Sequence, residues 1–233
     1  MKSVINYLLW LIFPRHCAVC SKLIDRDSYL CDECEENIER IDKICTVCAS
    51  DKKSCICKRR VFHFTGATSV FNHGDYSKQT VNNFKFRGNG EIAEFLSVEM
   101  SKSVKENLGD IKFDMVVPVP MHPVKRFING FNHSEKLAVL IADNIGTQYK
   151  NPLKKIKFGK TQHRSSYKER RENVKGMFAC EKIHAKNVLL VDDIRTTGAT
   201  LDECARQLMF AGAHRVYCVT AITNNYKKST VEK

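Results

Sequence analysis

The chain has 233 residues, of which 27% are charged, and a formal net charge of +12. That length allows one α/β domain with a small appendage, and the positive charge predicts an acidic partner such as nucleic acid, a polyphosphate substrate or anionic lipid. The apolar run of residues 4–13 is too short to span a bilayer, which excludes a transmembrane helix there.

The first predicted element is a short helix over Val4–Phe13 that packs on the body of the protein. No small-residue cleavage site follows it, so the stretch does not read as a secretory signal peptide. Contact with a membrane surface is the less favoured alternative. We therefore expect a cytoplasmic protein, in which thiols stay reduced and clustered cysteines bind metal.

Eight of the eleven cysteines lie between residues 17 and 57, in four close pairs. Two pairs complete the tetrahedral shell of four thiolates that Zn²⁺ prefers, so the segment predicts one or two structural zinc ions. Metal binding would supply most of the folding energy here, on the order of 10–16 kcal/mol per ion. The simplest pairing is local, with an interleaved pairing and disulfides as alternatives. The local sets are Cys17, Cys20, Cys31 and Cys34, and Cys45, Cys48, Cys55 and Cys57.

A domain boundary is predicted between Lys58 and His63, where the cysteines give way to β-branched and aromatic residues. The expected domains are residues 1–60, with the N-terminal helix and the zinc ribbons, and residues 61–233. Residues 61–73 favour a strand, as a hairpin arm that covers a sheet edge, and residues 84–90 favour a turn with two basic side chains. Residues 91–108 show helical spacing of apolar side chains.

Residues 113–120 predict a buried strand that is terminated by prolines. The loop that follows carries positive charge and leads to a predicted helix over residues 134–144. This loop is therefore a candidate anion site, and the alternative for its two cations is ordinary solvated surface charge. The candidate residues are Pro120, Met121, His122, Lys125 and Arg126.

Residues 154–175 contain nine basic and two acidic side chains with no sustained apolar face. That composition favours a mobile, hydrated loop. Such a loop can act as a lid over a polyphosphate substrate or as a track for a nucleic-acid backbone, and the alternative is a charged loop that maintains solubility. Its candidate residues are Lys160, Gln162, Arg164, Arg170 and Asn173.

Residues 188–200 carry the most informative pattern in the chain. Val188–Val191 predicts a strand buried on both faces, with Asp192 and Asp193 at its end. A threonine-rich turn around Gly198 then leads into a helix over residues 201–211. Backbone N–H groups and the helix dipole attract phosphate there, and the carboxylates suit sugar hydroxyls or Mg²⁺. The alternative is an ordinary βα turn beside a chance acidic pair.

This stretch resembles the 5-phosphoribosyl-1-pyrophosphate (PRPP) motif of type I phosphoribosyltransferases. The resemblance implies an α/β fold with a mainly parallel sheet flanked by helices. It also implies that Asp192 and Asp193 engage the ribose hydroxyls, that Mg²⁺ accompanies PRPP, and that the earlier loop binds the pyrophosphate leaving group. The residues it assigns to the 5′-phosphate are Arg195, Thr196, Thr197, Gly198, Ala199 and Thr200.

The whole chain is similar to the ComF family, which joins a double zinc ribbon to a phosphoribosyltransferase-like domain and is associated with DNA uptake in natural transformation. The resemblance implies PRPP and single-stranded DNA as ligands and a ComFA-type helicase as partner. In one departure, Asn129 stands where the family usually has Arg, and an amide does not replace the forked contact of a guanidinium with phosphate. The other matching residues are Pro118–Pro120, Gly130–Asn132, Thr161, Gln162, Arg170 and Asn173.

Two functions are compatible with these patterns. The first is a phosphoribosyltransferase with an unidentified acceptor, which acts by aligning the reactants and neutralising the departing pyrophosphate. The second is a non-catalytic zinc-ribbon adaptor that binds single-stranded DNA and a helicase. Backbone contacts would dominate that binding and make it depend steeply on salt.

Overall fold

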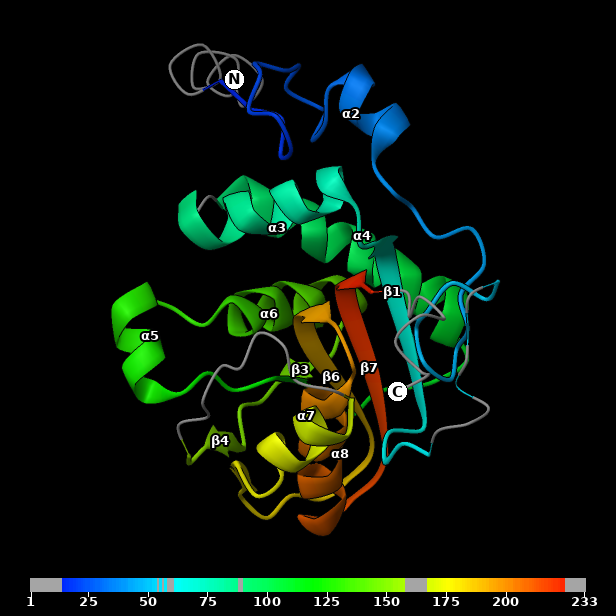
Figure 1. The fold of residues 1–233 in the computed structure, drawn as a ribbon, viewed down its shortest axis with the longest axis vertical. Helices are drawn as coiled ribbons and strands as arrows, with labels where there is room; N and C mark the ends of the chain where they lie inside the picture. The colour runs from blue at the N-terminus through cyan, green and yellow to red at the C-terminus, as the bar shows by residue number, and fades with distance from the viewer. Residues whose placement is uncertain are drawn as a thin grey trace.

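A parallel five-stranded sheet forms the centre of the computed structural model (Figure 1), which describes residues 14–53, 55, 57, 61–87, 90–157 and 167–224. Its strands run in the order β1 (Gly66–Asn72), β7 (Ala213–Thr223), β6 (Ala185–Arg195), β2 (Met115–Pro118) and β3 (Gln148–Tyr149). All four pairings are parallel. The prediction of an α/β fold with a mainly parallel sheet is therefore confirmed.

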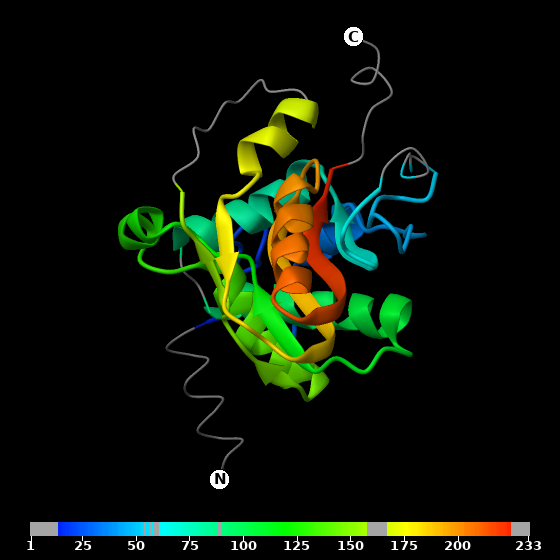
Figure 2. The same cartoon turned by 90° about the horizontal axis from the view of Figure 1, so that it is seen from below.

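Helices cover both faces of this sheet, and a small antiparallel pair lies beside it. The pair consists of β4 (Leu153–Lys155) and β5 (Phe178–Cys180). The described helices are α2 (Asp32–Asn37), α3 (Asp75–Arg87), α4 (Gly90–Leu108), α5 (Pro123–Asn129), α6 (His133–Ile145), α7 (Tyr167–Val174) and α8 (Ala199–Phe210). Figure 2 shows α8 in front of the sheet, with α4 and α6 behind it.

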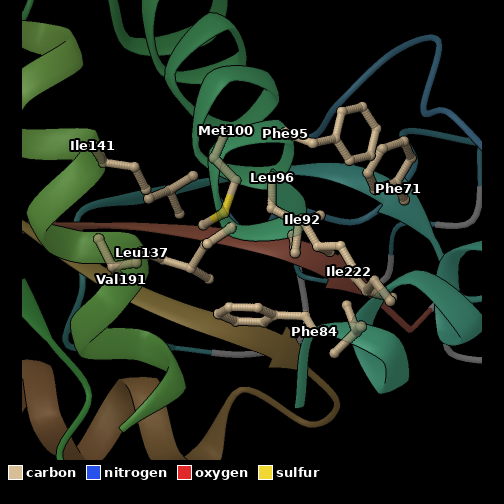
Figure 3. Close-up of a cluster of buried hydrophobic side chains, with 14 of the residues drawn as sticks. Phe71, Phe84, Ile92, Phe95, Leu96, Met100, Leu137, Ile141, Val191 and Ile222 are labelled. Carbon is tan, nitrogen blue, oxygen red and sulfur yellow. The ribbon is translucent and has the colours of Figure 1, made fainter. Parts of the chain in front are cut away.

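Strand β6 is buried on both faces, as its unbroken apolar run predicts. Val188 and Leu190 point into the cluster that includes Leu201 and Leu208 of α8. Leu189 and Val191 alternate with them and point into the opposite cluster. In that second cluster Leu96 and Met100 of α4 meet Leu137 and Ile141 of α6 above the sheet (Figure 3). The helices on the two faces therefore hold β6 in a fixed position and direction within the sheet.

The cysteine-rich segment is packed into the same body. Cys17, Leu30 and Cys34 belong to the apolar cluster that contains Phe71 and Phe95. The chain around Arg40 runs antiparallel to the outer edge of β1, where Ile41 N donates to Val70 O at 3.1 Å and Asn72 N donates to Glu39 O at 2.7 Å. This segment, rather than a hairpin arm, covers that edge of the sheet.

Five sequence expectations need correction. The strand in residues 61–73 is β1, which pairs in parallel with β7 rather than forming a hairpin. Residues 84–87, expected in a turn, continue α3, and the proline-rich loop contains a helix, α5. The basic stretch 154–175 is partly ordered, because β4 and α7 occupy its two ends. Strand β6 does not end at the acidic pair but continues to Arg195. The helices expected over residues 91–108, 134–144 and 201–211 are present as α4, α6 and α8.

Some predictions fall on residues that the structure does not describe. These are the helix over Val4–Phe13 and the loop residues Lys160, Gln162 and Arg164. For Arg170 only the backbone, within α7, is described. Among the described helices, none combines the length and the apolar character that crossing a membrane requires.

Candidate functional site

The eight clustered cysteines form two separate groups of four thiols, and all of them are free. In each group the sulfur atoms lie within 4.8 Å of one another. Cys20 Sγ is 3.7 Å from Cys31 Sγ, and Cys45 Sγ is 3.6 Å from Cys57 Sγ. A tetrahedral ion with Zn–S bonds of about 2.3 Å separates its sulfurs by roughly 3.8 Å, so both groups fit zinc. The two groups are the sets expected from the local pairing of the cysteines. The structure therefore does not show the two alternatives, which were an interleaved pairing and disulfides.

Each group contains a tight turn that directs backbone N–H groups at a thiol. Ser21 and Ala49 have φ of 62° and 56°, which turns the chain back just after Cys20 and Cys48. Burial raises the pKa of Cys17, but hydrogen bonds from the backbone at Cys20, Cys31 and Val19 outweigh it and lower the pKa to about 7. A thiol that ionises readily is a better zinc ligand.

A cleft of about 200 Å³ lies at the carboxyl ends of β2 and β6. From β2 the chain crosses to β3 on one side, and from β6 it crosses to β7 on the other. The cleft therefore lies where the strand order reverses, which is the usual ligand site of open α/β sheets. Its lining consists of Lys85, Val119, Pro120, Met121, His122, Lys125, Asn129, Asn132, His133, Ser134, Lys155, Asp192 and Asp193.

The two adjacent carboxylates form one wall of this cleft. Ser134 Oγ, at the start of α6, donates to Asp192 Oδ1 at 2.8 Å, and Asp193 N donates to the same oxygen at 3.0 Å. Burial, and then the negative charge of Asp193, raise the pKa of Asp192 to about 7. The pair therefore favours a bound cation or a proton.

Lysines surround the acidic pair. Lys85, from the end of α3, places its Nζ 2.6 Å from Asp193 Oδ2. Lys155 of β4 and Lys125 of α5 line the same cleft. Burial, followed by the charge of Lys125, lowers the pKa of Lys155. The cleft therefore combines two acids with three amines, a composition that suits a ligand carrying both a metal ion and phosphates.

The structure brings most of the predicted loop residues beside the acidic pair. Pro120, Met121, His122 and Lys125 all line the cleft. Arg126 does not, because its NH1 lies 3.0 Å from Glu135 Oε2 outside the lining. Asn129, which stands where the family usually has Arg, does line the cleft.

The threonine-rich turn follows β6 at the same edge of the sheet but does not line this cleft. Gly198 is the N-cap of α8 with φ of 78°, and an added Cβ would lie 3.3 Å from Arg195 Nε. Arg195 itself points inward with 1% of its surface exposed, and NH1 donates to Ser50 Oγ at 3.2 Å and Thr223 Oγ1 at 2.8 Å. Direct contact of Arg195 with phosphate does not fit this geometry; the side chain supports the turn from inside.

Sequence reasoning assigned no role in this cleft to Lys85, Asn132 or Ser134, and it placed Lys155 only in the basic stretch of residues 154–175. Asn132 is the N-cap of α6, where its Oδ1 accepts from Ser134 N, and its Nδ2 donates to Val119 O at 3.1 Å. Asn132 thereby connects the loop after β2 to the start of α6, where Ser134 donates its hydrogen bond to Asp192. Asn132 was already among the residues that match the family, in the stretch Gly130–Asn132. In contrast, nothing in the local sequence predicts that Lys85 pairs with Asp193.

Two known domain families match the chain. The family described as "Double zinc ribbon domain" matches residues 8–60, and "Phosphoribosyl transferase domain" matches residues 91–233. Competence protein ComFC of Bacillus subtilis is 27% identical over 203 residues, which cover 82% of each chain. DNA utilization protein YhgH of Salmonella typhimurium is 26% identical over 87% of this chain and 88% of its own. Among solved structures, adenine phosphoribosyltransferase from Saccharomyces cerevisiae is 19% identical with a TM-score of 0.39, covering 60% of this chain and 72% of that chain.

Loss of one zinc ligand is expected to destabilise the whole protein. The Cys20→Ser variant should lower the zinc content from two ions per chain to one. Because Cys17 and Cys34 pack with Phe71 and Phe95, calorimetry should show one transition with Tm lowered by about 10 °C or more. Cys180→Ser, a free cysteine outside both groups, is the matched control and should retain two ions. A separate transition at lower temperature, with the main transition unchanged, would contradict shared packing.

The raised pKa of Asp192 predicts a pH-dependent stability gain in the Asp192→Asn variant. In the native state the carboxyl holds its proton up to about pH 7, against 3.8 ordinarily, so the charged form costs native stability as pH rises through that window. In magnesium-free buffer the variant should exceed the native protein in stability by on the order of 1 kcal/mol at pH 8 and by little at pH 4. Urea unfolding at both pH values measures this, and an equal difference at both would contradict it.

Proposed function

Because the chain belongs to the phosphoribosyltransferase domain family, and with its zinc ribbons to the ComF family, we propose that the cleft binds PRPP together with Mg²⁺. One observation carries this proposal: an acidic pair and a cationic loop line a single cleft at the reversal of strand order. A ligand with hydroxyls on one side and phosphates on the other would contact both halves of this arrangement.

The lining of the cleft and the turn before α8, which lies at the same edge of the sheet, each have a role in this proposal. Asp192 and Asp193 would hold the ribose hydroxyls and the metal, with Ser134 fixing the orientation of Asp192. His122, Lys125 and the backbone after β2 would hold the diphosphate, and the turn of residues 196–200 would hold the 5′-phosphate at the start of α8. Bound Mg²⁺ would neutralise charge on the leaving diphosphate.

The reaction class that this arrangement supports is displacement of pyrophosphate from C1 of the ribose by a nucleophile. The protein would act by alignment and by charge neutralisation, since the cleft offers no arrangement for covalent catalysis among its described lining residues. His133 is buried, and that burial lowers its pKa, so it is neutral near pH 7 and does not serve as a further cation. The acceptor is unidentified.

The double variant Asp192→Asn/Asp193→Asn is expected to abolish magnesium-dependent PRPP binding in titration calorimetry. Neutral amides retain hydrogen-bonding capacity but lose the attraction for Mg²⁺ and for the charge that develops on the ribose. Because removing charge at Asp192 should stabilise the fold, misfolding would not explain the loss.

The adjacent acidic pair Glu35 and Glu36 on α2 provides the matched control, and its double Gln variant should bind PRPP like the native protein. Retention of PRPP affinity in the Asp192/Asp193 variant would refute the assigned ribose site. No PRPP binding by the native protein would favour the adaptor function instead.

A second function, binding of single-stranded DNA, is favoured by helix α5. No residue of this helix is buried, and the helix projects from the body of the protein (Figure 1). Two of its residues, Lys125 and Asn129, line the cleft. Its Phe127 is 91% exposed and Ile128 is 75% exposed, next to the basic residues Lys125 and Arg126. Exposed rings beside cations are what unpaired bases and their phosphates recognise. We infer that single-stranded DNA binds along the exposed face of α5. The basic stretch of residues 154–175 would provide a second contact with the DNA backbone.

The remaining proposals concern partner and location. The ribbons expose Leu23 and Val47, two apolar residues available to a protein partner such as a ComFA-type helicase. A cytoplasmic location suits two sites made of free thiols, because reducing compartments keep cysteines available for metal.

Phe127→Ala is expected to weaken binding of oligothymidylate by roughly 5- to 100-fold, the value of one stacked base, with the salt dependence unchanged. Fluorescence anisotropy at several salt concentrations measures both quantities. Phe210→Ala is the matched control, since Phe210 is 77% exposed on α8 and also lies beside an arginine, Arg206. Equal affinity of the two variants would remove α5 from the DNA-binding surface.

A further inference from the structure

The ion pair between Lys85 and Asp193 is the closest contact between opposite charges within the cleft. Lys85 Nζ lies 2.6 Å from Asp193 Oδ2, and the two side chains are 29% and 14% exposed. Lys85 belongs to α3 and precedes residue 91, where the match to the phosphoribosyl transferase domain begins. It is therefore supplied to the acidic pair by a part of the chain outside that match.

The end of α3 is held in this position by contacts of its own. The carbonyl oxygen of Lys85 is 3.3 Å from Nε2 of His133, which is buried at the start of α6. Phe84, the preceding residue, is fully buried and packs edge-on against the ring of His133. The backbone is thus held in place, whereas the four-carbon side chain of Lys85 is partly exposed and lines the cleft.

The position of Lys85 conflicts with metal binding. An ammonium that close to Asp193 Oδ2 occupies one side of the oxygen that Mg²⁺ would approach, and two cations sharing one carboxylate repel each other. Without a ligand, Lys85 neutralises part of the charge of the acidic pair. When phosphates enter beside Lys125, they offer the ammonium a second anion in the same cleft.

We propose that Lys85 is an internal counter-ion of the acidic pair, which exchanges Asp193 for the diphosphate when PRPP and the metal bind. This rests on the proposed function. It makes Lys85 a positioning residue with two consequences: metal alone binds weakly, and PRPP strengthens metal binding by removing the competing ammonium. By linkage, the metal strengthens PRPP binding by the same factor.

The test is the affinity of Mn²⁺ alone, measured by electron paramagnetic resonance, for the native protein and for Lys85→Met. Removing the ammonium should raise Mn²⁺ affinity by about fivefold, and should lower the affinity for PRPP with saturating Mg²⁺ by about tenfold. Lys85→Arg retains the charge and should keep the low Mn²⁺ affinity. Lys78→Met, on the same helix and paired with Asp75 instead, is the matched control and should resemble the native protein in both measurements.

Unchanged or weaker Mn²⁺ binding by Lys85→Met would overturn the proposal, and so would a rise in affinity shared by Lys78→Met or Lys85→Arg. Failure of the proposed function gives a different result, because the native protein would then bind no PRPP with any metal. If Lys85→Met showed higher Mn²⁺ affinity but unchanged PRPP affinity, the proposed movement of Lys85 from Asp193 to the diphosphate would be overturned.

Discussion

Two adjacent carboxylates at the end of a buried strand need positive charge nearby, and much of this structure supplies it. Strand β6 is fixed from both faces by apolar helices, so Asp192 and Asp193 cannot move away from each other or into water. Burial and mutual repulsion raise the pKa of Asp192, while the hydroxyl of Ser134 and the ammonium of Lys85 partly compensate the pair. The remaining negative potential faces a cleft whose other wall carries Lys125 and Lys155. A metal ion with a polyphosphate sugar would satisfy both walls together.

The zinc ribbons belong to this arrangement rather than standing apart from it. Thr46, between two cysteines of the second group, accepts a hydrogen bond of 2.6 Å from Ala67 of β1. Ser50, between Cys48 and Cys55 of the same group, accepts one from Arg195, whose guanidinium lies under Gly198 at the start of α8. Glu39 caps the start of α3, the helix that carries Lys85, by accepting from Ser77 N at 2.9 Å. The folding energy that zinc supplies thus also stabilises the two ends of the proposed ligand site.

Local patterns in the sequence were sufficient for much of this account. The apolar run before Asp192 predicted a strand buried on both faces, and the spacing of the cysteines predicted the two local groups, because both depend on neighbours in the chain. Lys85 meeting Asp193 depends on how α3 lies against the sheet, which no local pattern records. Helix α5 was missed because three prolines favoured a loop, yet Pro123 occupies the first turn, where proline is tolerated, and His122 caps it. Arg195 was assigned to phosphate from its place in the motif, but its side chain is buried and donates to Ser50 and Thr223 instead.

The central claim is that one cleft holds a metal ion and a phosphoribosyl diphosphate together. The most direct measurement is a crystal structure of the protein soaked with Mn²⁺ and PRPP, with anomalous scattering used to locate the metal. We predict a manganese peak beside Asp192 and Asp193, with the diphosphate next to His122 and Lys125 and the 5′-phosphate at the turn before α8. A manganese peak only elsewhere, or an empty cleft at saturating PRPP with Lys85 still paired to Asp193, would contradict the account.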